Sequence, residues 1–132
     1  MQKKLTRLVI ALIGVLIPLL SSTDSLQAMP VPGGNDMTLT SNRGGHQYTT
    51  TFKGFNVANA TTGAFEEINE DNEAEERTGW TWKKVGDDIF VYDNNGNKVA
   101  TYHGGAQPAN QNGAIEDNPD VAGTFGGNWT RP

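Results

Sequence analysis

The chain has 132 residues, with 10 basic and 15 acidic side chains, a formal net charge of −5 and no cysteine. Disulfide bonds and a cysteine nucleophile are therefore excluded. A net negative surface repels phosphate backbones, so we expect no nucleic-acid partner.

The first 28 residues have the three parts of a secretory signal peptide. Basic residues come first, an apolar run from Leu8 to Leu20 follows, and small and polar residues lead to Ala28. The apolar run contains Pro18 and is shorter than the roughly 20 residues that a membrane-spanning helix needs. We therefore predict a cleaved signal over residues 1–28 rather than a membrane anchor. The mature protein is then secreted or periplasmic, and its domain does not span a membrane.

After the signal, residues 29–36 contain two prolines and a glycine pair, and we interpret them as a flexible leader. Residues 37–132 are enough for a single small domain and too few for two domains with separate cores. The domain begins with a strand, a turn at Asn42–Gly45 and a longer Thr-rich strand. A glycine within that second strand predicts a bulge near Lys53–Gly54.

The segment from Ala64 to Arg77 holds seven carboxylates and one arginine. We expect either a short acidic helix or a solvated loop, because like charges four residues apart weaken a helix. Calcium is an alternative here, with Asp71 and Glu73 as weak candidate ligands. The segment lacks the central Gly and terminal Glu of an EF-hand loop, so we predict no metal or other cofactor.

A three-stranded antiparallel meander is predicted between Trp80 and His103. Asn95–Gly96 fits a two-residue type I′ turn, and Gly86–Asp87 fits a type II′-like turn. Counting outward from Gly86–Asp87 pairs Trp82 with Val91 and Lys83 with Phe90. Counting outward from Asn95–Gly96 pairs Tyr92 with Val99, Val91 with Ala100, Phe90 with Thr101 and Ile89 with Tyr102.

Alternation along the meander separates two faces. We expect the core face to carry Trp80, Trp82, Ile89, Val91, Ala100 and Tyr102. The opposite face mixes aromatic and polar groups. We predict its residues Thr81, Lys83, Phe90 and Tyr92 as a ligand-binding surface for a protein or a carbohydrate.

From about residue 104 the chain is rich in Gly, Asn and Pro, and we expect it to be mostly irregular. One last strand is predicted near Val121–Phe125 and Trp129. No internal repeat can be aligned. The predicted fold is therefore all-β, a small antiparallel sheet or sandwich of five to six strands around the meander.

No combination of residues typical of catalysis is present, since the chain has no G-x-S-x-G motif and its two histidines lack a zinc-site spacing. We therefore expect a secreted, non-catalytic binding or accessory module of the cell envelope or extracellular space, and an enzyme is less favoured. One alternative is a self-assembling matrix protein that pairs through an exposed edge strand at Gln47–Phe52. A small secreted hydrolase is the second.

Overall fold

The structure is a computed structural model that describes residues 34–121 and 125–132. Residues 35–132 form one compact unit. The predicted signal peptide lies outside the described residues. Within the part of the chain that is described, no helix is long and apolar enough to cross a membrane.

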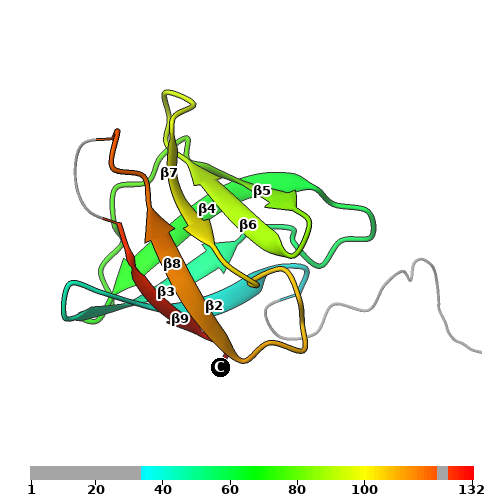
Figure 1. The fold of residues 1–132 in the computed structure, drawn as a ribbon, viewed down its shortest axis with the longest axis horizontal. Helices are drawn as coiled ribbons and strands as arrows, with labels where there is room; N and C mark the ends of the chain where they lie inside the picture. The colour runs from blue at the N-terminus through cyan, green and yellow to red at the C-terminus, as the bar shows by residue number, and fades with distance from the viewer. Residues whose placement is uncertain (1–33, 122–124) are drawn as a thin grey trace, which may run out of the picture. The chain divides into compact units, whose positions relative to one another are not determined.

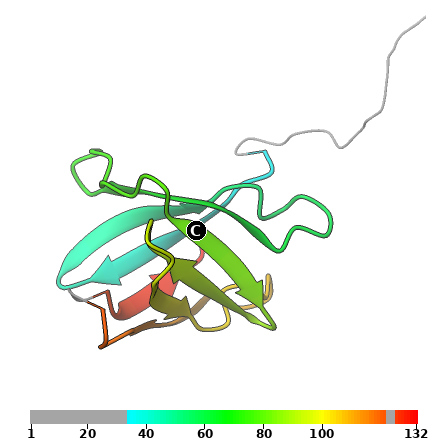
Figure 2. The same cartoon turned by 90° about the horizontal axis from the view of Figure 1, so that it is seen from above.

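Eight antiparallel strands form a closed barrel in which neighbours in the chain are neighbours in space (Figures 1 and 2). Pairing of the first strand with the last closes the barrel. The strands are β2 (Met37–Arg43), β3 (His46–Phe52), β4 (Thr62–Asn69), β5 (Thr81–Val85), β6 (Asp88–Tyr92), β7 (Lys98–Tyr102), β8 (Asn112–Asp117) and β9 (Gly127–Thr130).

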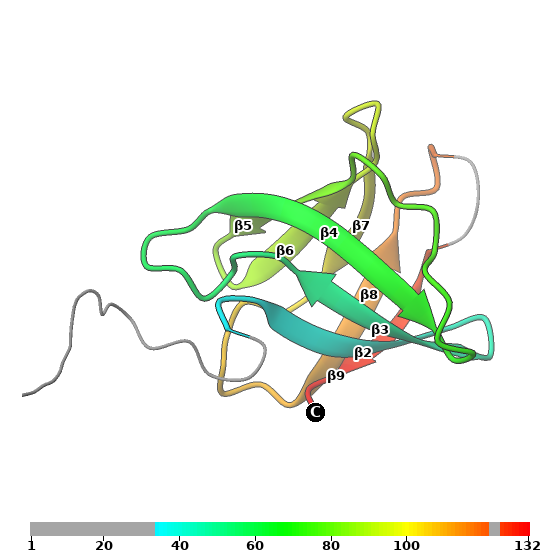
Figure 3. The same cartoon turned by 180° about the vertical axis from the view of Figure 1, so that it is seen from behind.

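The all-β antiparallel prediction is confirmed, but the predictions of five to six strands and of an acidic helix are wrong. The start of the acidic segment is the long strand β4 (Figure 3). Alternation in β4 turns Phe65 and Glu67 inward and leaves Glu66 exposed, so neighbouring carboxylates face opposite sides of the wall. The segment after residue 104, expected to be mostly irregular, supplies β8 and β9, which complete the barrel.

The meander is confirmed in most of its register. Every predicted pair between β5 and β6 is present, and β6 pairs with β7 as predicted from Ile89 to Val91. Tyr92, however, pairs with Lys98 rather than Val99, because the ladder shifts at a bulge. The type I′ prediction is wrong, since only Gly96 has a positive φ in this turn. The Asp93 carboxylate accepts two backbone N–H bonds and holds a longer turn.

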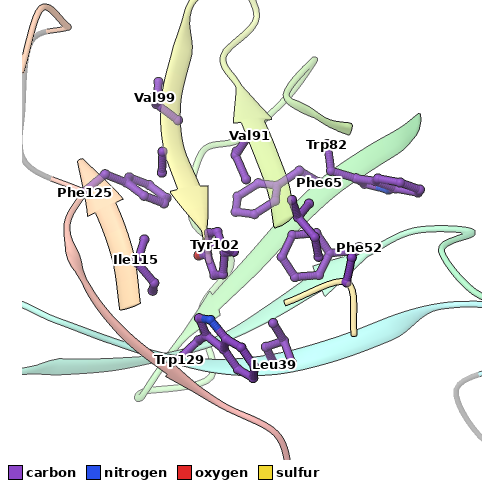
Figure 4. Packing of buried hydrophobic residues seen from close by; sticks show 13 residues of the cluster. Leu39, Phe52, Phe65, Trp82, Val91, Val99, Tyr102, Ile115, Phe125 and Trp129 are labelled. Atoms are coloured by element: carbon purple, nitrogen blue, oxygen red, sulfur yellow. The ribbon is translucent and has the colours of Figure 1, made fainter. Parts of the chain in front are cut away.

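Side chains from all parts of the wall fill the barrel interior (Figure 4). Aromatic rings dominate, and the Phe52 ring meets Tyr102 edge to face with centroids 5.3 Å apart. The fully buried large side chains are Trp82, Trp129, Tyr102, Phe52, Phe65, Leu39, Ile89 and Val91. The described side chains thus pack as the filled core of a small barrel.

Candidate functional site

An ion pair is buried inside the barrel toward the end that carries the β2–β3 turn. The Arg43 guanidinium donates to both carboxylate oxygens of Glu67, at 2.5 and 2.8 Å. The Glu67 side chain is fully buried and that of Arg43 is 7% exposed. Thr50 and Arg77 add hydrogen bonds of 2.8 and 3.2 Å, so each Glu67 oxygen accepts two. The charge of Glu67 is therefore compensated within the protein.

Three hydroxyl groups lead to this carboxylate in a chain whose direction can be deduced. Thr50 gives its one hydroxyl hydrogen to Glu67, so at 2.6 Å the Ser41 hydroxyl must donate to Thr50. At 3.0 Å Tyr102 must in turn donate to Ser41. Tyr102 therefore has to keep its proton. Burial, with the nearby Glu67 charge, raises the pKa of Tyr102 to about 12, which agrees with that assignment.

This polar cluster has the character of a structural element. Its carboxylate is saturated with donors and its hydroxyls are committed to one another, so none of them is poised as a nucleophile or general base. A satisfied buried network fixes the positions of the strands that contribute to it. It holds the inner wall of β2, β3, β4 and β7 in place beneath the neighbouring surface.

That surface contains a groove where β4 continues beyond its ladder with β5. The two strands pair over only three residue pairs, ending at Ala64 with Thr81. Beyond that point, Phe65 donates to the Trp80 carbonyl at 3.1 Å and Glu75 to the Glu67 carbonyl at 2.9 Å. The opening holds about 700 Å³. We call it the β4–β5 groove, and it is lined by Ala64, Phe65, Glu66, Glu67, Ile68, Ala74, Glu75, Arg77, Thr78, Gly79, Trp80 and Thr81.

Arg77 and Trp80 are the central side chains of the groove. The Arg77 guanidinium lies 4.4 Å from the centre of the Trp80 ring and 3.2 Å from Glu67, and it remains 19% exposed. Trp80 also stacks on Phe65, with centroids 5.9 Å apart and planes 22° apart, and contacts Phe125 at 5.8 Å. The groove is thus anchored to the buried cluster through an arginine and to the core through an indole.

The four residues of the predicted ligand-binding surface lie together on the outside of β5 and β6. Thr81 pairs with Tyr92 and Lys83 pairs with Phe90. The Lys and Thr are exposed and the two aromatic residues are half-buried. We call these four residues the β5–β6 patch. Its Thr81 also lines the β4–β5 groove, so the patch and the groove form one continuous surface.

Sequence reasoning missed the groove itself. It assigned Trp80 to the core face, although Trp80 is only partly buried and lines the opening. It noted Arg77 only as the single cation of an acidic segment. The sequence signal for the groove was an arginine and a tryptophan three residues apart, Arg77 and Trp80, just before the strand that begins at Thr81. Whether the guanidinium stacks on the indole depends on the loop conformation, which the sequence does not reveal.

The weak calcium candidates lie in a turn that is closed by Asn69. The Asn69 side-chain oxygen accepts the backbone N–H groups of Asp71 and Glu73 at 2.9 and 3.0 Å. His46 begins β3 and His103 follows β7, which runs in the same direction, so the two histidines lie at opposite ends of the barrel. Among residues 34–121 and 125–132, no group of three or more His, Asp or Glu is placed to hold a metal ion.

Comparison with known protein families, with curated proteins and with solved structures finds no match. The function is therefore inferred from the groove, the patch and the buried cluster.

Proposed function

We propose that the protein is a non-catalytic binding module of the cell envelope or extracellular space, and that its ligand occupies the β4–β5 groove and reaches onto the β5–β6 patch. The groove carries the proposal. Its volume of about 700 Å³ falls within the usual range for ligand sites. Its walls combine apolar surface with a few charged groups, which is the usual chemistry of such sites.

The aromatic rings at this surface favour a protein ligand over a carbohydrate. Stacking on a sugar requires a free aromatic face. The Trp80 ring already packs against Arg77, Phe65 and Phe125. A face of the Phe90 ring of the patch is occupied by another residue of the protein, since the Lys98 ammonium lies over the ring at 4.1 Å from its centre.

Charge narrows the chemistry of the partner further. Of the seven carboxylates between Glu66 and Glu76, only Glu67 is buried, and of the other six Glu66 and Glu75 line the groove. An exposed Ile68 side chain, 38% accessible, adds an apolar contact at the same place. A peptide segment that combines lysine or arginine with an aliphatic residue is complementary to both features.

The two other functions have less support. The matrix alternative required an unpaired edge at Gln47–Phe52, but β3 pairs with β2 on one side and with β4 on the other. A hydrolase would need a reactive group, whereas the one buried carboxylate that lines the groove, Glu67, is saturated by hydrogen bonds.

Amide chemical-shift mapping tests the proposal with a short peptide of alternating lysine and leucine. We expect shifts concentrated at residues 64–81, and Ile68→Lys should weaken binding about tenfold or more by adding a like charge. Val57→Lys is the control, because Val57 is also an exposed apolar side chain, 46% accessible, and lies outside both the groove and the β5–β6 patch. Equal weakening by both variants, or shifts spread over the whole acidic surface, would show that the groove is not the site.

A further inference from the structure

The two halves of the barrel repeat the same backbone arrangement in the connection that follows their second strand. In the first half, Lys53 donates to the Ala64 carbonyl at 2.9 Å, and in the second His103 donates to Ala114 at 2.9 Å. Four further bonds match in the same way. In the first half, written from donor N–H to acceptor carbonyl, they are Phe55 to Phe52, Val57 to Gly54, Ala60 to Val57 and Lys84 to Thr61. Their counterparts in the second half, in the same order, are Gly105 to Tyr102, Gln107 to Gly104, Asn110 to Gln107 and Arg131 to Gln111.

In each half, a buried tryptophan donates the same hydrogen bond to the start of this connection. The Trp82 indole donates to the Lys53 carbonyl at 2.9 Å, and the Trp129 indole donates to the His103 carbonyl at 2.9 Å. A glycine lies against each indole: an added Cβ would come within 2.6 Å of the indole nitrogen at both Gly63 and Gly113. Figure 4 shows the two tryptophans at separate edges of the core, Trp82 at the upper right and Trp129 at the bottom.

An aspartate at the start of each half completes the correspondence. The carboxylate of Asp36 accepts the Gly54 N–H at 2.8 Å, and that of Asp88 accepts the Gly104 N–H at 2.8 Å. The residue before each glycine carries a basic side chain that faces this aspartate. It is Lys53, at 2.9 Å from Asp36, in one half, and His103, at 3.7 Å from Asp88, in the other.

These correspondences overturn the expectation that the chain holds no internal repeat. Within residues 35–132, identical residues fifty positions apart are few, and they are Thr51 and Thr101, Gly54 and Gly104, Gly63 and Gly113, Ala64 and Ala114, and Glu66 and Glu116. The spacing also changes along the chain, because Asp36 corresponds to Asp88 and Trp82 to Trp129. Short insertions thus interrupt the alignment of a diverged repeat.

We propose that the barrel is a tandem duplication of one four-stranded unit, residues 35–85 and 86–132, and that a second copy of this chain can supply either unit. The units meet at two junctions, β5 with β6 and β9 with β2. Each junction joins the last strand of one unit to the first strand of the other. Only the two-residue turn Gly86–Asp87 connects the units covalently, so the same pairing can form between two chains.

Among the residues that the structure describes, the segment that forms the β4–β5 groove differs from its counterpart in the second unit. Fifteen positions separate Glu67 from Trp82, whereas twelve separate the corresponding Asp117 from Trp129. Trp80 corresponds to Gly127, whose position has no room for a side chain, because an added Cβ would collide with the Asn42 carbonyl oxygen. A unit can therefore build its half of the barrel without a tryptophan at this position.

Deleting Gly86 and Asp87 from the otherwise complete chain tests exchange of units. Without its turn, β5 cannot pair with β6 of the same chain, and light scattering should show a dimer of twice the monomer mass with an unchanged far-ultraviolet spectrum. The unaltered protein is the control. A native monomer, or an unfolded or aggregated deletion variant, would overturn the exchange of units.

A loop exchange tests the equivalence of the units independently. Residues 53–63 are replaced by the sequence of residues 103–113, which has the same length, and the control carries that sequence in reverse order. The forward exchange should unfold cooperatively and keep native tryptophan fluorescence, whereas the reversed loop should lose both. Equal damage by the two loops would refute the duplication.

Discussion

Replacing Glu67 by glutamine should destabilise the barrel severely, although the change is nearly isosteric. Glu67 accepts all four of its hydrogen bonds, two at each carboxylate oxygen. A glutamine carboxamide keeps one acceptor oxygen and replaces the other by an NH₂ donor group, which would face two donors. Arg43 would keep its charge in a site where its side chain is only 7% exposed. Leaving one partner of a buried pair uncompensated typically costs about 3–5 kcal/mol. That is a large part of the roughly 5–15 kcal/mol that stabilises a domain.

The reciprocal change and the double variant separate the attraction within the pair from the cost of burying it. Arg43→Met keeps an unbranched side chain beside the Tyr48 and Phe125 rings, on which the guanidinium now lies at 4.2 and 3.8 Å. Alone it should cost about as much as the loss of Glu67. In the double variant with Glu67→Leu, no buried charge of the pair remains unpaired. The residual cost is that Thr50 and Arg77 lose their acceptor, about 1–3 kcal/mol for the buried hydroxyl and less for Arg77, whose side chain is 19% exposed.

Urea unfolding followed by tryptophan fluorescence measures the four proteins of the cycle, which are the unaltered protein, Glu67→Leu, Arg43→Met and the double variant, with Glu67→Gln measured beside them. The double variant should be more stable than either single variant, which corresponds to a coupling free energy of several kcal/mol. If the two single losses simply add, or if Glu67→Gln costs less than about 1 kcal/mol, then the pair is not a desolvated unit and the description of the cluster is wrong.

Three further predictions concern the core and the outer surface. Because burial raises the pKa of Tyr102 to about 12 from an ordinary value of 10.0, the unfolded chain loses this proton first. The contribution of Tyr102 to stability should be constant up to about pH 10 and fall toward pH 12, so Tyr102→Phe should make the measured fall smaller, and a fall of unchanged size would contradict the assignment. Gly63→Ala and Gly113→Ala should each cost about 1–3 kcal/mol in denaturant midpoints, since both methyl groups meet an indole and a backbone carbonyl, and a neutral effect at either position would disprove the tight contact. Trp82→Ala should cost about 3–5 kcal/mol, and Tyr92→Ala much less, because Tyr92 is half-buried on the outer face; equal losses in thermal and chemical unfolding would remove the β5–β6 patch as a candidate surface.

The parts of the fold that follow from the sequence are those that neighbouring residues determine. The Gly86–Asp87 turn fixes the β5–β6 register, and alternation then separates Trp82 from Lys83. The same reasoning failed at Asn95–Gly96, because the Asp93 side chain captures two backbone amides and favours a longer turn. A local pattern is decisive only where no side chain competes for the backbone.

The site depends on contacts between residues distant in the sequence, and these leave little trace in it. Glu67 resembles its exposed neighbour Glu66 until β2 places Arg43 opposite it, inside the barrel. The β4–β5 groove likewise requires that β4 be longer than β5, which the acidic composition of its second half concealed. The β5–β6 patch was predictable as a surface because alternation alone defines it, and its role in binding stays a prediction.

Closure of the barrel by β2 and β9 has a consequence for the rate of folding. Seven of the eight strand pairings join neighbours in the chain and can form as hairpins or short loops. The eighth brings Ser41 against Trp129 and closes a loop of nearly the whole domain. Its chain-entropy cost rises only with the logarithm of loop length, but it must be met before the contact stabilises anything. We therefore expect the β2–β9 ladder to form late, and substitutions in it to accelerate unfolding more than they slow folding.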